Sequence, residues 1–192
     1  MNLNRAENER LKPEPPPRLA PLRKFPPYAF AGSPQPHPRN HPEGHSRGLP
    51  EVIPPPLDPA RWPESEDYLH GIDLFNHGYY WEAHEAWEGL WMAAGKTGPI
   101  SELMKGLIKL AAAGVKARQA EPEGIRRHAE RARAHFEAAR RLSGVERFAG
   151  FGLGELMEFC KEVGRRAEDW PAHPGRVVAV VFERLLIPAD GR

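Results

Sequence analysis

The prolines of this chain are unevenly distributed, and their distribution limits where regular structure can form. Sixteen of the 22 prolines lie within the first 60 residues, with runs at residues 15–17 and 54–56. Proline fixes φ and lacks an amide donor, so this region favours an extended polyproline conformation over helix or strand. We therefore predict an extended arm over residues 1–60, a folded domain over residues 61–170 and a tail over residues 171–192.

The arm carries large apolar side chains, which a fully disordered segment would lack. They are Phe25, Tyr28, Phe30, Leu49, Val52 and Ile53. Two arrangements are compatible with this composition: an arm pinned across the surface of the folded domain, and an arm that is partly disordered.

Three histidines of the arm recur at every fourth position, at His37, His41 and His45. Imidazoles are ligands for zinc, nickel and copper, but only a helix would align this spacing. Pro38 and Pro42 prevent that helix. We therefore predict a polar turn region and no metal site, with these three histidines as the weak candidates for one.

Hydrophobic side chains recur at helical spacing over most of residues 61–170. The pattern predicts one helix from about residue 63 to Phe75, and others over residues 79–92, 100–119, 121–142 and 153–163. Glycines and prolines separate these stretches and leave room only for short turns. The predicted fold class is all-α, an up-and-down helical bundle of about five helices that carries the proline-rich arm.

The tail contains the β-branched run between Arg176 and Ile187. Periodicity leaves two conformations open here, a short strand beside the arm or a docked helix.

Bulk properties exclude several classes of protein. Cys160 is the single cysteine, which rules out an internal disulfide and fits a reducing compartment, and its place on an apolar helix side predicts an inert core thiol. No apolar run approaches the ~18 residues of a membrane span, and the first residues lack the apolar stretch of a secretory signal. We predict a cytoplasmic protein without a membrane partner.

Nucleic acid is an unlikely partner by the same reasoning. The formal net charge is +1, so no global field attracts a polyanion. The arginines of residues 121–142 alternate with glutamates, which favours an ordinary solvated helix face with ion pairs between successive turns.

The stretch from Tyr79 to Met92 concentrates the polar and aromatic side chains that could form a site. On a helix, Tyr80, His84, Trp87 and Trp91 share one stripe, so we predict that His84 faces the core. Glu88 follows His84 by one turn, while Glu82 and Glu85 point away from the centre. The predicted binding residues are Glu82, His84, Glu85, Trp87, Glu88 and Trp91.

Two interpretations of this centre remain open. A histidine among aromatic rings often fixes packing or helps to line a pocket. Alternatively, a carboxylate one turn away orients the ring, as in a general base or part of a metal site. His84 and Glu88 are the candidate catalytic residues, although position 88 departs from the His-Glu-x-x-His zinc helix.

The same stretch belongs to a larger motif. The motif reads Leu74-Phe75-Asn76-x-Gly78-x-Tyr80-x-Glu82-Ala83-His84-Glu85-x-x-Glu88-x-x-Trp91, followed by Gly106-Leu107-Ile108-x-Leu110-Ala111-Ala112-Ala113. It resembles the bacterial and archaeal family catalogued as domain of unknown function 309, over roughly residues 68–142. The resemblance implies a small, all-helical up-and-down bundle and no particular activity.

These observations favour a binding or scaffold module with a buried polar centre. The alternative is a metal-dependent or acid–base enzyme, hydrolase-like, that uses His84 and Glu88. The sequence identifies no cofactor, leaves open whether the protein is an enzyme, and suggests only that a partner is a protein or a small molecule.

Overall fold

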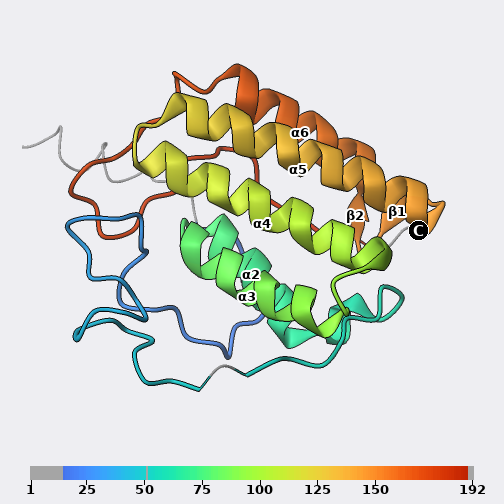
Figure 1. Ribbon diagram of the computed structural model, residues 1–192, viewed down its shortest axis with the longest axis horizontal. Coiled ribbons are helices and arrows are strands. Elements are labelled where there is room, and N and C mark those ends of the chain that lie inside the picture. Colours follow the sequence, from blue (N-terminus) through green and yellow to red (C-terminus); the bar gives the residue numbers. More distant parts are fainter. Residues whose placement is uncertain (1–14, 51, 190–192) are drawn as a thin grey trace, which may run out of the picture.

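The computed structural model describes residues 15–50 and 52–189, so the first 14 residues of the predicted arm and the last three of the tail lie outside the described residues. Five α-helices form the bundle (Figure 1). They are α2 (Glu66–Asn76), α3 (Tyr80–Ala93), α4 (Gly98–Arg118), α5 (Pro122–Ser143) and α6 (Leu153–Arg165). Successive helices pack on one another, so the predicted all-helical fold is confirmed.

Two short elements complete the bundle. A 3-10 turn, η1 (Trp62–Glu64), precedes α2. Between α5 and α6, the strands β1 (Arg147–Phe148) and β2 (Phe151–Gly152) pair antiparallel, with Phe148 opposite Phe151. No helix of the described chain is long and apolar enough to cross a membrane.

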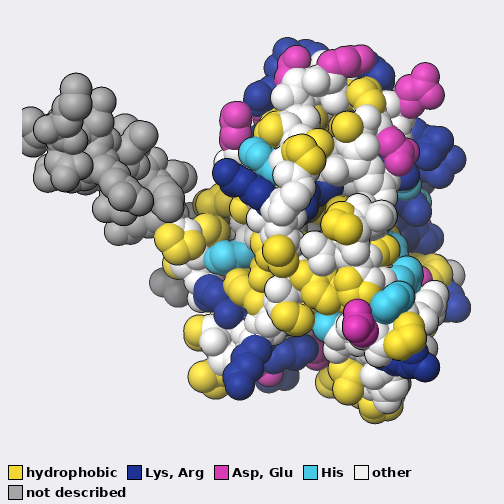
Figure 2. Space-filling model, turned by 90° about the vertical axis from the view of Figure 1, so that its left-hand side faces the viewer, with side chains coloured by type: hydrophobic (Ala, Val, Ile, Leu, Met, Phe, Trp, Pro, Cys, Tyr) yellow, Lys and Arg dark blue, Asp and Glu magenta, His cyan; other side chains and the backbone are white. Residues whose placement is uncertain are grey.

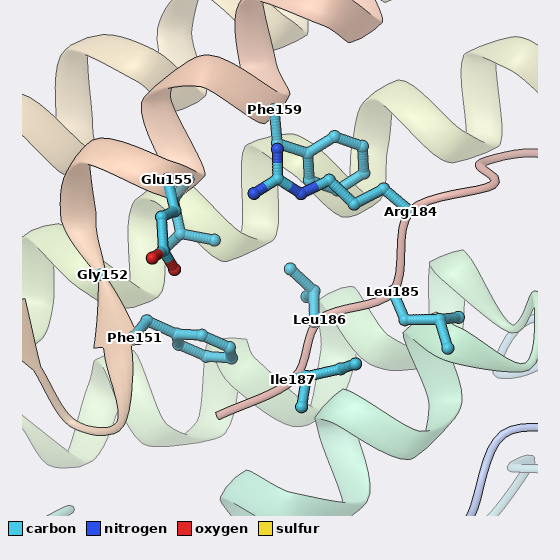
Figure 3. Close-up of a pocket in the computed structure, with 9 residues that line it drawn as sticks. Phe151, Gly152, Glu155, Phe159, Arg184, Leu185, Leu186 and Ile187 are labelled. Carbon is cyan, nitrogen blue, oxygen red and sulfur yellow. The ribbon is translucent and has the colours of Figure 1, made fainter. Parts of the chain in front are cut away.

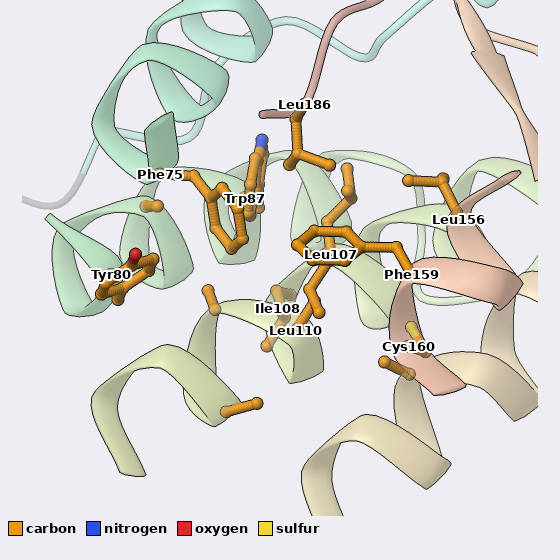
Figure 4. Packing of buried hydrophobic residues seen from close by; sticks show 14 of the residues in the cluster. Phe75, Tyr80, Trp87, Leu107, Ile108, Leu110, Leu156, Phe159, Cys160 and Leu186 are labelled. Carbon is orange, nitrogen blue, oxygen red and sulfur yellow. The ribbon is translucent and has the colours of Figure 1, made fainter. Parts of the chain in front are cut away.

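All five helices contribute to the core, and Figure 4 shows part of it, with side chains of α2, α3, α4, α6 and the tail. Trp87, Leu107 and Phe159 are at most 1 % exposed. Full burial of such side chains stabilises the folded state by about 1.5–3 kcal/mol each, which makes this cluster the main source of stability. Helix α4 approaches α5 closely at Gly106, where a Cβ atom would lie 2.3 Å from the Phe136 ring.

The described part of the arm follows the outside of α2 and α3 with neither helix nor strand, forms successive turns over residues 33–48, and is held in its first part by α2. Asp73 is 1 % exposed, and its carboxylate accepts hydrogen bonds from the amides of Leu19 and Ala20, both at 2.8 Å. Arg18 donates to the same carboxylate at 3.3 Å. A buried carboxylate with three donors is a strong polar anchor, so this part of the arm is pinned to the bundle.

The tail passes the end of α2 and the start of α3, and residues 171–189 form neither of the two regular conformations that the sequence left open. Its side chains enter the core, where Phe182 and Leu186 are 2 % exposed. The Asn76 side chain bonds both the amide and the carbonyl of Leu186, at 2.8 Å each, and the Tyr80 hydroxyl accepts from the Val181 amide. Burial, rather than strand pairing, fixes its course.

Arm and tail meet at one end of the bundle. The Ala29 amide donates to the Val177 carbonyl at 3.1 Å. Seen from this end, hydrophobic side chains and several histidines gather across the middle of the surface, and most acidic side chains lie above them (Figure 2). Gly78 permits the close passage of the tail, because a Cβ atom there would lie 2.5 Å from the Ala179 carbonyl oxygen.

The end of the tail also forms one wall of a pocket beside α6 and β2 (Figure 3). The pocket measures about 340 Å³. Phe151, Leu156, Phe159 and Leu186 supply apolar walls, and Glu155 and Arg184 lie at its polar side.

Candidate functional site

Helix α3 turns one side to the core and another toward the arm and solvent. Its most buried apolar residues are Tyr80, Ala83, Trp87 and Leu90, which follow the helical spacing of three and four residues. The core side is therefore centred on Ala83 and Leu90. The sequence had placed that centre too far around the helix, toward Trp91.

This rotation corrects the predicted environment of His84. Its side chain is 30 % exposed and lies at the border of the core instead of facing it. The Nδ1 atom is nevertheless shielded from solvent and forms no hydrogen bond within the described chain. Trp91 is partly buried in the same way, and its indole Nε1 also lacks a partner there.

His84, Glu85 and Glu88 form a compact polar cluster on this border, and we call it the α3 triad. One ligand atom from each side chain can be chosen so that all three atoms lie within 4.8 Å of one another. His84 Nδ1 lies 3.6 Å from Glu85 Oε1. Glu85 thus lies outside the core, as predicted, but turns toward His84.

Arg39 of the arm contacts the other oxygen of Glu85. Its Nε atom donates to Glu85 Oε2 at 2.9 Å, which leaves Oε1 on the His84 side. Burial alone would raise the pKa of Glu85, but the attraction of His84 and the hydrogen bond from Arg39 outweigh it and lower the pKa below its ordinary value. Glu85 is therefore ionised and oriented at neutral pH.

Glu82 has a different role from the one predicted. It is 6 % exposed, because the arm covers it, although the sequence had placed it pointing away from the centre. Its Oε1 atom accepts the Phe30 amide at 2.9 Å and lies 3.2 Å from His45 Nε2. Glu82 is an anchor for the arm and lies beside the triad without joining it.

The three arm histidines do not converge on one point. His45 contacts Glu82, the His37 ring packs edge-on against Trp81 at 5.5 Å, and His41 accepts the Glu43 amide at its own turn. Over residues 15–50 and 52–189, the α3 triad is the one group of three histidine, cysteine or acidic side chains close enough to share a metal ion.

Trp87, another predicted binding residue, is buried in the core and lies too deep to touch a ligand at the α3 triad. It is 0 % exposed and packs so closely on α2 that a Cβ atom at Gly71 would lie 2.4 Å from its Nε1. Trp81 is the tryptophan beside the arm, and its ring meets Phe30 edge-on at 5.7 Å.

One imidazole and two carboxylates form a ligand set that suits divalent transition metals such as zinc or manganese. All three come from a single helix, so the helix backbone fixes their relative positions. Arg39 was not foreseen from the sequence, because an arginine in a proline-rich arm carries no local signal of what it will contact.

Residues 68–128 match the family model described as a domain of unknown function, DUF309. The family resemblance inferred from the sequence is thereby confirmed. The matched segment spans α2, α3, α4 and the first turns of α5, and so includes the α3 triad. No curated protein and no solved structure matches this chain.

Proposed function

Given that residues 68–128 match the DUF309 domain, we propose that this domain is a binding module whose α3 triad takes up one divalent transition-metal ion. The observation that carries the proposal is the convergence of His84, Glu85 and Glu88 within 4.8 Å. Side chains one turn apart on a helix are neighbours, and a cation between Glu85 and Glu88 would offset the repulsion of the two carboxylates.

The charge around the triad supports the proposal. Arg39 supplies one positive charge, but it contacts only Glu85 Oε2. Oε1 remains for a metal on the His84 side, and the guanidinium then acts as an outer partner that orients a ligand, a common arrangement at metal sites. The shielded Nδ1 of His84 has no hydrogen-bond partner within the described chain, and a bound metal ion would accept its lone pair.

Metal titration tests the proposal directly. The full chain, first treated with chelator, is titrated with Zn²⁺ and with Mn²⁺ by calorimetry. We expect one equivalent to bind, and saturation at about 100 times Kd to add about 2.7 kcal/mol to the free energy of unfolding. His84→Ala and Glu88→Gln remove this binding.

His135→Ala is the matched control. His135 Nδ1 lies 2.7 Å from Glu102 Oε2, so it is also a histidine–glutamate pair, but it has no third ligand. We expect metal binding to persist in this variant. Absence of binding to the wild type, or equal loss in the His135 variant, refutes the proposal.

The partial exposure of His84 favours a second candidate, a metal-dependent hydrolase-like enzyme. Three protein ligands with an open side are typical of catalytic zinc sites, where the metal supplies an activated water. The zinc-loaded chain is assayed with p-nitrophenyl acetate and bis(p-nitrophenyl) phosphate. Turnover that is abolished by Glu88→Gln supports the enzyme. Binding of one equivalent of metal without turnover supports the binding module instead.

A further inference from the structure

The seam between α4 and α5, on a part of the bundle that the α3 triad does not use, holds two histidines in unlike surroundings. The two helices lie side by side along their length (Figure 1). At one end, Glu102 accepts Lys105 and contacts His135, both at 2.7 Å. His128 lies two turns earlier on α5 and contacts no acid within the described chain, while Glu121 pairs with Lys116 beyond it at 2.8 Å.

Cations surround His128. Burial, followed by the charges of Lys109, Arg127, Arg131 and Lys116, lowers its pKa to about 4. No carboxylate acts on it in the opposite direction. The ring forms no hydrogen bond within the described chain, and its Nδ1 is shielded and unpartnered. The field at this end of the seam is therefore positive.

Three of the six arginines of α5 have acidic partners. Arg126 pairs with Glu168, Arg133 with Glu130 and Glu137, and Arg140 with Glu146. Arg127, Arg131 and Lys109 have no acidic partner within residues 15–50 and 52–189, although both arginines are exposed. The sequence-based expectation of ion pairs between successive turns thus describes Arg133 but not Arg126, Arg127 or Arg131.

Unpaired like charges one turn apart destabilise a helix, so Arg127 and Arg131 gain most from an anion supplied by a partner. We propose that these two arginines and Lys109, here called the cationic seam, bind the phosphate backbone of double-stranded nucleic acid. Positively charged side chains that track phosphates supply most of the affinity in such contacts.

Features of the same surface favour a duplex over other polyanions. A membrane surface engages apolar side chains as well as cations, and α4 and α5, both fully described, expose no large hydrophobic side chain before Leu142. Single strands are held by aromatic stacking, and no aromatic residue of these helices is exposed. Arg127 and Arg131 stand exposed one turn apart on a rigid helical face, an arrangement that suits the regular phosphates of a duplex, and Glu123 is the exposed acid one turn before them.

Fluorescence anisotropy of the full chain with a labelled 20-base-pair duplex, as DNA and as RNA, tests the proposal. With three phosphate contacts, log K should fall with log salt with a slope of about −2.7. Arg127→Ala with Arg131→Ala should reduce affinity at least tenfold at low salt and bring the slope to about −0.9.

The double variant Arg126→Ala with Arg133→Ala is the matched control, since it also removes two positive charges from α5. It should change affinity less than twofold. Circular dichroism confirms that both variants fold. No duplex binding at low salt, or equal loss in the control, overturns the proposal. Stronger binding to the single strand or to phosphatidylserine vesicles, or complete competition by equimolar pyrophosphate, also overturns it.

Discussion

The arm and the tail lie against the same bundle, but different chemistry holds each of them. Carboxylates of the helices hold the arm through its backbone amides: Asp73 binds Leu19 and Ala20, and Glu82 binds Phe30. The tail is held by its own side chains, of which Phe182 and Leu186 are almost completely buried.

This difference has consequences for stability. Polar anchors depend on charge and geometry at a few atoms, whereas buried apolar side chains belong to the packing of the whole core. The arm buries few large side chains, chiefly Tyr28 and Leu57. We therefore expect that the arm can detach from an intact bundle, and that the tail can be released only when the bundle unfolds.

The largest effect is expected at the tail. Phe182→Ala should lower the free energy of unfolding by about 3–5 kcal/mol, because it leaves a cavity among aromatic rings, including those of Phe75 and Trp170. Urea denaturation measures the change. Val180→Ala is the control, since Val180 is 44 % exposed, and it should change stability by less than about 0.5 kcal/mol. A small effect at Phe182 would mean that the tail also detaches independently.

Asp73→Ala should weaken the docking of the arm, with a loss of free energy about half of that expected for Phe182→Ala. It removes the acceptor of two amides and of Arg18, a loss of about 2–3 kcal/mol that falls on arm docking. Hydrogen exchange should accelerate at Leu19 and Ala20 while the core of α4 stays protected. Exchange that accelerates equally in α4 would contradict independent detachment.

Acid should loosen the arm before the tail. Burial, then Arg23 and Arg18, lower the pKa of His70 to about 4, and the Phe25 ring stacks on it at 6.2 Å. Because this pKa lies below the unfolded value of about 6.5, its contribution to stability is complete above pH 6.5 and is lost as the pH falls toward 4. With screening considered, we expect a loss of about 1–2 kcal/mol.

His70→Gln should flatten this part of the pH profile of thermal stability. His128, whose pKa is also about 4, remains in the variant and accounts for a residual slope. A profile identical to that of the wild type would show that His70 does not couple protonation to folding.

A smaller effect belongs to a polar contact of the tail. The Tyr80 hydroxyl accepts the amides of Val181 and Phe182, at 2.9 and 3.3 Å. Tyr80→Phe should cost about 1 kcal/mol, well below the loss at Phe182, as judged by urea denaturation. A larger loss than that of Phe182→Ala would show that polar contacts dominate at both ends of the chain.

The smallest effect is expected at the exposed ion pair of the arm. Arg39→Ala should change stability by less than about 1 kcal/mol, because Arg39 is 41 % exposed. By contrast, it should weaken metal uptake at the α3 triad, if Arg39 orients Glu85. Calorimetry separates the two results, and unchanged metal affinity would remove Arg39 from the proposed site.

Sequence periodicity placed the helices well, since apolar spacing depends only on neighbours along the chain. It placed the core side of α3 less well. His84 and Trp87 lie 60° apart on the helix, and only the packing of α2 and α4 decides which of them is fully buried. The sequence predicted that His84 and Glu88 lie one turn apart, but it placed Glu85 on the side of the helix that points away from them.

The sequence by itself determined the number and type of the helices and the family resemblance, because helical spacing and motif residues are local properties. Only the tertiary structure decided that Asp73 and Glu82 are buried anchors, that Phe182 enters the core, and that Arg127 and Arg131 lack acidic partners among the described residues. These three features depend on contacts between residues that are distant in the sequence. The sequence around an acid, a phenylalanine or an arginine is the same whether or not such a contact forms, so it does not predict the contact.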